Sequence, residues 1–299
     1  MRLVSFLIEE RDAQQQRSDA TRTGVVVDGE VVDLTDPAVG LPGDMADLLA
    51  GGPGAMERAA GAAGGGAARY PLESVRLLAP VPRPPKVMAI GMNYGAHVAE
   101  MGRPAPEHQV WFNKQRTCVV GPGAAIEIPG ASDQVDYEGE LAFVVGRRCR
   151  HVVAADAASV VAGFTIMNDV SVRDWQWRTP TWTMGKSFDT HGPSGPWLVT
   201  TDEIADPQNL RLRTWVNDDL RQDSSTKDMI FSCWAMVEEL STVFTLEPGD
   251  VVSTGTPAGV GASFDPPKWL RAGDTVRIEV EGVGVLENPV IDEGAPARS

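Results

Sequence analysis

The stretch from residue 136 to residue 146 constrains this chain more than any other. It reads DYEGELAFVVG, a buried strand in its second half with three carboxylates leading into it. Alternate residues of an extended chain share a face, so Glu138 and Glu140 point the same way, with Asp136 beside them if the strand extends that far. Two neighbouring carboxylates raise each other's pKa, so this pair predicts a bound cation at the mouth of an apolar strand. The alternative is a solvated strand end with two unrelated acids.

The length, net charge and cysteine content of the chain narrow the classes of protein to consider. A length of 299 residues suits one large domain, or a large domain and a small one. The formal net charge of −15 argues against a nucleic-acid or anionic-membrane partner and leaves room for a cation site. Three scattered cysteines without a CxxC motif predict reduced thiols in a cytoplasmic protein. The N-terminus has no pattern of a signal peptide or a membrane span.

The first 75 residues form the smaller predicted unit. A strand is expected over 2–8, and a hairpin over 24–34 because Asp28-Gly29 supplies the turn. A short helix is expected over 44–49, while the Gly- and Ala-rich segment 51–69 predicts a flexible connection or a weak helix. Four prolines between 77 and 86 exclude a helix or a central strand there. We therefore expect a small N-terminal domain over 1–75 and a main domain over 76–299.

The main domain is predicted to be rich in short strands with few helices, which places the chain in the α+β class. One convincing long helix is expected over 229–244, with Asp228 as its N-cap, because apolar residues recur there at helical spacing. A short helix over 93–102 ends at a glycine, and another precedes the strand at 163. The other expected strands are 86–91, 110–114, 163–169, 198–200, 211–216 and 277–280, with a hairpin at 282–286.

Familiar catalytic signatures are absent. The run around Lys186 lacks the first glycine of a phosphate-binding loop, and no HExxH zinc motif occurs. What remains is a distributed set of acids. Asp169 ends an apolar strand, and together with Glu138 and Glu140 it would make an all-carboxylate site of the kind that Mg²⁺ or Mn²⁺ prefers.

Further polar residues have both a functional and a structural explanation. His97 and Glu100 are three residues apart on the expected helix, so a carboxylate could orient an imidazole as a general base; the alternative is an unrelated surface pair. Lys186 lies among apolar neighbours and is a functional cation or part of a buried salt bridge. The glycines of 254–261 permit close approach of a ligand, or simply form a tight loop.

Taken in order, five segments resemble the fumarylacetoacetate hydrolase family: residues 90–101, 137–141, 168–174, 185–189 and 254–261. Each is weak alone, and five in order are specific. The resemblance covers about 85–290 and implies a mixed β-sandwich roll with a small N-terminal α/β domain, usually as a homodimer. It implies Mg²⁺ or Mn²⁺, with Ca²⁺ as a substitute in crystals, held by Glu138, Glu140 and Asp169.

The resemblance also implies roles for other residues. His97 and Glu100 match a water-activating pair on a lid, and Lys186 matches an active-site lysine. Substrate contacts are implied for three further residues: Arg173, Gly255 and Thr256. One departure is that this chain has Gln115 after Lys114 where many members have proline, which leaves the backbone path there open.

The function implied is hydrolysis of a C–C bond in a 2,4-diketo acid of the acylpyruvate or fumarylpyruvate type. The alternatives are decarboxylation of an oxaloacetate-like acid, and isomerisation or hydration of an unsaturated 2-keto acid. A ligand-binding protein without turnover would be expected to lack His97 or Lys186, and both are present. The expected partner is a small keto acid, without nucleic acid or membrane. The loops near 102–110 and 174–184 are expected to select its tail.

Overall fold

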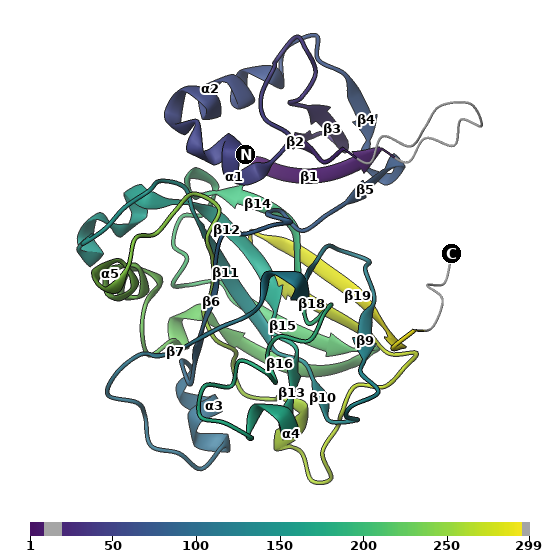
Figure 1. The fold of residues 1–299 in the computed structure, drawn as a ribbon, viewed down its shortest axis with the longest axis vertical. Coiled ribbons are helices and arrows are strands. Elements are labelled where there is room, and N and C mark those ends of the chain that lie inside the picture. The colour runs from purple at the N-terminus through teal and green to yellow at the C-terminus, as the bar shows by residue number, and fades with distance from the viewer. Residues whose placement is uncertain (9–19, 295–299) are drawn as a thin grey trace.

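A large sheet extends from the N-terminal end of the molecule into its main body (Figure 1). The structure is a computed structural model that describes residues 1–8 and 20–294. The helices are α1 (Met45–Ala50), α2 (Gly52–Ala62), α3 (Gly95–Glu100), α4 (Arg173–Gln176) and α5 (Cys233–Val243), with 3-10 turns at Leu72–Ser74, Arg116–Cys118, Ala154–Val160, Thr201–Glu203, Thr226–Asp228 and Gly261–Ser263. The strands are β1 (Arg2–Ile8), β2 (Arg22–Val27), β3 (Glu30–Asp33), β4 (Arg69–Pro71), β5 (Val75–Leu77), β6 (Val87–Gly91), β7 (Val110–Asn113), β8 (Val119–Val120), β9 (Ile126–Ile128), β10 (Val135–Asp136), β11 (Gly139–Val145), β12 (Val161–Asn168), β13 (Ser171–Val172), β14 (Gly192–Thr200), β15 (Arg211–Val216), β16 (Asp219–Ser225), β17 (Val251–Ser253), β18 (Thr275–Val280) and β19 (Gly284–Asp292).

The strands form two main sheets. The 12-stranded sheet has the order β4-β3-β2-β1-β14-β12-β11-β17-β6-β7, with β5 beside β1 and β8 beside β14. The 5-stranded sheet has the order β16-β15-β18-β19-β9. Most pairs are antiparallel, and β6 with β17 is a parallel pair. This strand-rich mixed arrangement confirms the predicted α+β class.

The two faces of β11 pack against different cores. Leu141 and Phe143 belong to the cluster that joins the large sheet to the 5-stranded sheet, where Leu212 faces them. Ala142 and Val144 belong to a second cluster that includes the apolar side chains of α1 and α2. The alternation follows from the two-residue period of a strand. Because Glu138 and Glu140 continue the even-numbered series, they point away from the sandwich core.

The N-terminal segment occupies one end of the molecule and shares the large sheet (Figure 1). Strand β1 pairs with β14, with Arg2 opposite Val199, so the sheet is continuous across the predicted boundary near residue 75. The division into domains stays a prediction. The predicted hairpin is present, and Asp28 (φ 51°) and Gly29 (φ 82°) have the positive φ angles that its two-residue turn needs.

The structure decides one open prediction about a helix and corrects another. The segment 51–69, for which a flexible connection or a weak helix was open, contains helix α2, which buries Ala55, Ala59 and Ala62. The long helix predicted over 229–244 is shorter, Cys233–Val243, and the prediction of Asp228 as its N-cap was wrong. A 3-10 turn over 226–228 precedes it, and the Ser232 side chain accepts a hydrogen bond from the Ala235 amide instead.

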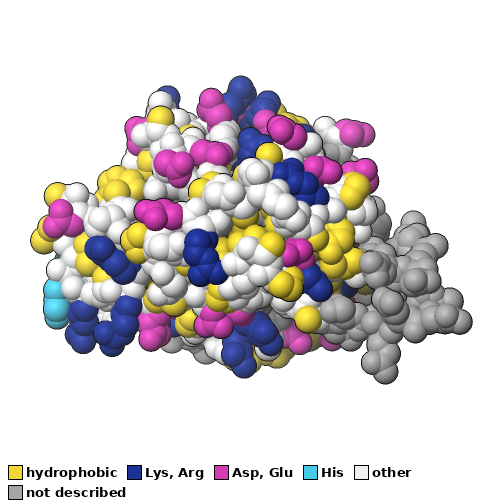
Figure 2. Space-filling model, turned by 90° about the horizontal axis from the view of Figure 1, so that it is seen from above, with side chains coloured by type: hydrophobic (Ala, Val, Ile, Leu, Met, Phe, Trp, Pro, Cys, Tyr) yellow, Lys and Arg dark blue, Asp and Glu magenta, His cyan; other side chains and the backbone are white. Residues whose placement is uncertain are grey.

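The surface seen from the N-terminal end mixes charges of both signs (Figure 2). On this face Lys and Arg side chains are scattered among Asp and Glu rather than gathered into a patch. Within residues 1–8 and 20–294, no helix has the length and apolar character needed to cross a membrane.

Candidate metal centre

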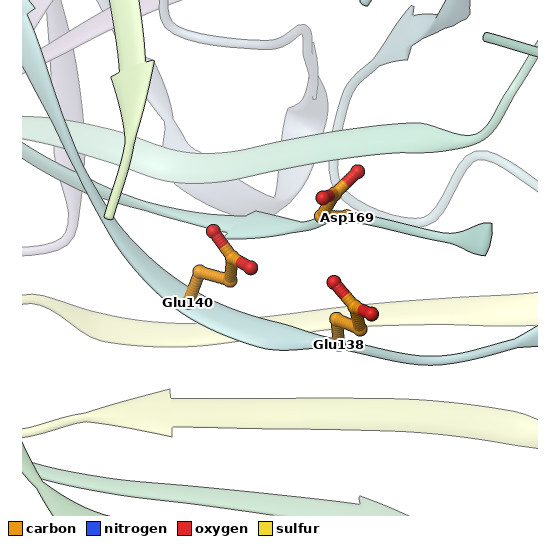
Figure 3. A group of neighbouring side chains, drawn as sticks. All are labelled: Glu138, Glu140 and Asp169. Carbon is orange, nitrogen blue, oxygen red and sulfur yellow. The ribbon is translucent and has the colours of Figure 1, made fainter. Parts of the chain in front are cut away.

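The register between β11 and β12 brings the three predicted acids together. Gly139 pairs with Asn168, and the Asp169 amide donates to the Glu138 carbonyl at 2.9 Å, so Glu138 and Asp169 lie opposite each other. Opposite residues of an antiparallel pair share a face, and so do alternate residues along a strand. Glu138, Glu140 and Asp169 therefore project into one space (Figure 3), and each offers an oxygen within 4.8 Å of the others.

Buried cations neutralise part of this cluster. Lys186 Nζ lies 2.7 Å from a Glu138 oxygen and 2.8 Å from an Asp169 oxygen. Arg173 Nη1 contacts the other Glu138 oxygen at 2.7 Å. Burial by itself would raise the pKa of Glu138, but Lys186 and Arg173 outweigh it and hold that pKa well below its usual range. Burial would lower the pKa of Lys186, and Asp169 and Glu138 reverse that effect and raise it.

Glu140 lacks a cation among the described residues. It is 1% exposed, and its Oε2 accepts hydrogen bonds from the Ser253 hydroxyl at 2.5 Å and the Gly255 amide at 2.9 Å. Burial, and then repulsion from Asp169 and Glu138, raises its pKa well above the ordinary value. A buried carboxylate with two acidic neighbours and no ion-pair partner among the described residues fits an oxygen-preferring divalent cation such as Mg²⁺ or Mn²⁺.

The charges around the centre leave a small negative excess. The ionisable residues buried around it are the acids Asp136, Glu138, Glu140 and Asp169 and the cations Lys114, Arg173 and Lys186. Glu100, which pairs with His97 at the same cavity, is a fifth carboxylate, so five acids against three cations leave a formal charge of −2. A divalent ion would neutralise this excess. The arrangement thus suits a divalent cation.

The predicted imidazole pair is formed and faces the same space. His97 Nδ1 lies 2.7 Å from Glu100 Oε1, and Glu100 Oε2 accepts the Gly259 amide at 3.0 Å. With Nδ1–H donated to Glu100, Nε2 carries the free lone pair. No hydrogen bond engages Nε2 within the described chain, and His97 lines the cavity together with Glu138 and Glu140. Its ring is thus oriented as a base requires.

The other predicted residues surround the metal centre. Thr256 lines the cavity, and its hydroxyl donates to the Gly139 carbonyl at 3.0 Å. The Gly255 amide already donates to Glu140, so this glycine supports a candidate metal ligand, and its contact with substrate stays a prediction. Arg173 joins the centre to Asp136, donating from Nε to Oδ2 at 2.8 Å. Asp136 itself stands outside the group of three acids and anchors the Gly261 amide at 2.7 Å.

Lys114 is a site residue that our sequence reasoning missed. Its side chain is fully buried, its Nζ lies 2.6 Å from Asp169 Oδ1, and it also donates to the Lys186 carbonyl. It therefore orients one of the three candidate metal ligands and the segment that carries Lys186. The signal was a lysine directly after an apolar strand, which burial makes costly unless it is paired.

The departure at residue 115 does not alter the backbone. Gln115 has φ −71° and ψ 138°, angles that a proline would also adopt. Because glutamine keeps its amide hydrogen, the chain gains a bond from the Gln115 amide to the Ser187 hydroxyl at 3.1 Å. Residues 114 and 115 thus both hold the segment 186–187.

The mouth of the cavity is formed by the two loops expected to select the substrate's tail. Met101 and Arg103 come from one loop, and Trp177 and Trp182 from the other. The cavity has a volume of about 30 Å³, which is on the order of two water molecules.

Comparison with known proteins gives both sequence relatives and structural neighbours. The family profile described as "Fumarylacetoacetate (FAA) hydrolase C-terminal" matches residues 86–291. "Oxaloacetate tautomerase fahd2, mitochondrial" of Xenopus laevis is 41% identical over 295 residues, which are 97% of this chain and 90% of that protein. "Oxaloacetate tautomerase FAHD2A, mitochondrial" of Homo sapiens is 42% identical over 267 residues, covering 88% of this chain and 84% of that protein.

Solved structures of similar proteins include enzymes with other reactions. Maleylpyruvate hydrolase of Sphingobium sp. SYK-6, solved with manganese(II) and pyruvate, has a TM-score of 0.81 and 34% identity, covering 98% of this chain and 99% of that one. The 5-carboxymethyl-2-hydroxymuconate delta-isomerase of Mycobacterium smegmatis has a TM-score of 0.77 and 38% identity, covering 98% and 100%. By the matched segment and the near full-length relatives, this chain is a member of the fumarylacetoacetate hydrolase family.

Proposed function

We propose that this protein is a divalent-metal-dependent enzyme that moves a proton next to the keto group of a 2-keto acid, as a tautomerase or isomerase does. The observation that carries the proposal is that three acids fit for a metal share one cavity with the free Nε2 of His97. Similar proteins named as oxaloacetate tautomerases and as an isomerase support this reaction class.

Glu138, Glu140 and Asp169 would hold the ion, since each offers a carboxylate oxygen to the same space. A bound divalent ion would supply polarisation of the keto group, which makes the neighbouring carbon acidic. The same donor set, and the manganese in the structure of the Sphingobium hydrolase, favour Mg²⁺ or Mn²⁺.

The chain's own residues would then perform the proton transfer. His97 Nε2 accepts the proton from the carbon next to the keto group, and Glu100 balances the charge of the resulting imidazolium. Negative charge develops on the keto oxygen, and Lys186 stabilises that charge across the cavity. His97 returns the proton to the oxygen for a tautomerisation, or to a carbon farther along the chain for an isomerisation.

Hydrolysis of a diketo acid is the second candidate, because the pair formed by His97 and Glu100 can equally activate water. His97 would take a proton from water, the oxygen would add to the remote carbonyl, and the C–C bond would break as the departing carbon takes the proton. The likeness to maleylpyruvate hydrolase supports this reaction. It differs from tautomerisation in releasing two products.

Two variants and two assays test the proposal. The loss of enol absorbance from oxaloacetate without release of pyruvate reports tautomerisation, and pyruvate release from acylpyruvates reports hydrolysis. We expect Glu138→Gln to lose Mn²⁺ binding in calorimetry together with activity. We expect His97→Asn to bind Mn²⁺ normally and to lose about 10²- to 10⁴-fold in turnover.

His151→Asn is the matched control, because His151 is exposed beyond the far end of β11 and does not line the cavity. It should match the wild type in both assays. Full activity after exhaustive chelation would contradict the role of the metal, and full activity of His97→Asn would contradict the base. If the protein released pyruvate from acylpyruvates but left the enol loss of oxaloacetate at its uncatalysed rate, hydrolysis would replace tautomerisation as the proposed function.

A further inference from the structure

Three aromatic side chains line the cavity in a row, and each end of the row lies next to a cation. Lys186 Nζ lies 5.0 Å from the ring centroid of Phe112, and the Arg103 guanidinium lies 5.5 Å from that of Trp177. Between them, Trp182 meets Phe112 edge-on at 5.7 Å and Trp177 edge-on at 6.4 Å. We call Phe112, Trp182 and Trp177 the aromatic row. It is a rigid apolar surface that leads from the metal centre to the mouth.

Arg103 is placed by the same helix that carries the imidazole. At the end of α3 the Gly102 amide bonds to the Ala99 carbonyl at 3.0 Å and the Arg103 amide to the Val98 carbonyl at 3.2 Å. With Gly102 at φ 64°, this is a Schellman motif, which fixes the first residue after the glycine relative to the helix. Arg103 and His97 therefore belong to one local unit, and Arg103 reaches the mouth because of this turn.

Arg103 differs from the other cations of the cavity because no carboxylate of the described chain pairs with it. The other cations that line the cavity, Arg173 and Lys186, are paired with buried carboxylates. Arg103 has no ion pair within the described chain, although its side chain is held over Trp177. A guanidinium offers a fork of donors that matches a carboxylate. Its position predicts an anion at the outer end of the cavity.

The pairing of the inner cations points to the same ligand. Arg173 and Lys186 are already paired with carboxylates of the centre. A second carboxylate on the substrate would therefore need a further cation, and Arg103 is the one at the mouth. Resting on the function proposed above, we infer that Arg103 recognises the distal carboxylate of a dicarboxylic 2-keto acid lying along the aromatic row. It is a specificity-determining residue for that substrate class.

The competing reading is a substrate with an apolar tail, which would pack on Trp177 and Trp182 without using Arg103. Fumarylpyruvate and its distal methyl ester separate the two readings, since they are longer than oxaloacetate and differ at the distal end in charge and one methyl group. We would measure kcat/KM for both with Mg²⁺ in the wild type, Arg103→Met and Arg103→Lys. Dissociation constants in a His97→Asn background give the same comparison without turnover.

We expect the wild type to prefer the diacid, and Arg103→Met to reduce that preference by about 10- to 100-fold, mainly through KM. Arg103→Lys should recover part of it. Arg148→Met is the matched control, because Arg148 is exposed beyond the far end of β11 and has no ion pair in the described chain. It should keep the wild-type preference.

Three results would overturn the inference. An unchanged preference in Arg103→Met, or an equal loss for acid and ester, would show that Arg103 does not read the distal carboxylate. In either case the proposed function would stand. Failure of both compounds, and of pyruvate, to bind the metal-loaded protein would instead overturn the proposed function and this inference together.

Discussion

Replacing Lys114 by methionine should destabilise the protein and change its response to metal. The lysine side chain is fully buried, and its ammonium group contacts Asp169 Oδ1 at 2.6 Å, the Val170 carbonyl at 3.4 Å and the Lys186 carbonyl. Methionine has a similar volume but no donor, so these oxygens would lose a buried partner.

The size of the expected loss of stability depends on the ion pair that Asp169 keeps in the variant. Removing one partner of a buried ion pair usually costs about 3–5 kcal/mol. Asp169 keeps Lys186 at 2.8 Å, so we expect the lower end, about 3 kcal/mol. For a chain of this length that lowers the midpoint of thermal unfolding by on the order of 5 °C.

Metal should offset part of this loss. Without Lys114 the formal charge of the centre falls by one unit, so Mn²⁺ should raise the unfolding midpoint of the variant more than that of the wild type. The assay is differential scanning fluorimetry with and without Mn²⁺. Lys227→Met is the control, since Lys227 is exposed and has no ion pair in the described chain. A metal-free midpoint equal to that of the control would refute the role assigned to Lys114.

Two further predictions concern pH and packing. Burial lowers the pKa of His191 to about 4, while its Nε2–H donates to the Glu127 carbonyl at 2.8 Å. An unfolded histidine titrates near 6.5, so between these values the unfolded state binds a proton that the folded state does not, and stability should fall by up to about 3 kcal/mol as the pH drops to about 4. Urea unfolding of His191→Gln over this range should show a shallower fall, and parallel curves would show that His191 is not the cause. At Gly91 a Cβ atom would lie 2.4 Å from the Trp182 ring, so Gly91→Ala should cost about 1–3 kcal/mol and alter near-UV circular dichroism. Gly95→Ala, with no atom within 4 Å, is its control, and equal melting of the two variants would contradict the clash.

Local patterns predicted the parts of the site that lie close together in the chain. Glu138 and Glu140 share a face because a strand repeats every two residues, and His97 meets Glu100 because a helix places residues three apart together. The start of α5 shows the limit of such patterns. Asp228 and Ser232 are both suitable N-caps, and the 3-10 turn over 226–228 decided between them.

The sequence by itself determined the strand with its acidic entrance, the helix with its imidazole and, through five ordered segments, the family. Tertiary structure alone decided that Lys114 and Lys186 share Asp169, that Glu140 has no cation among the described residues, and that Arg103 stands at the end of an aromatic row. The physical reason is distance along the chain. Periodicity acts over a few residues, whereas these contacts join segments tens of residues apart, and only the register of β11 with β12 and the packing of the loops bring them together.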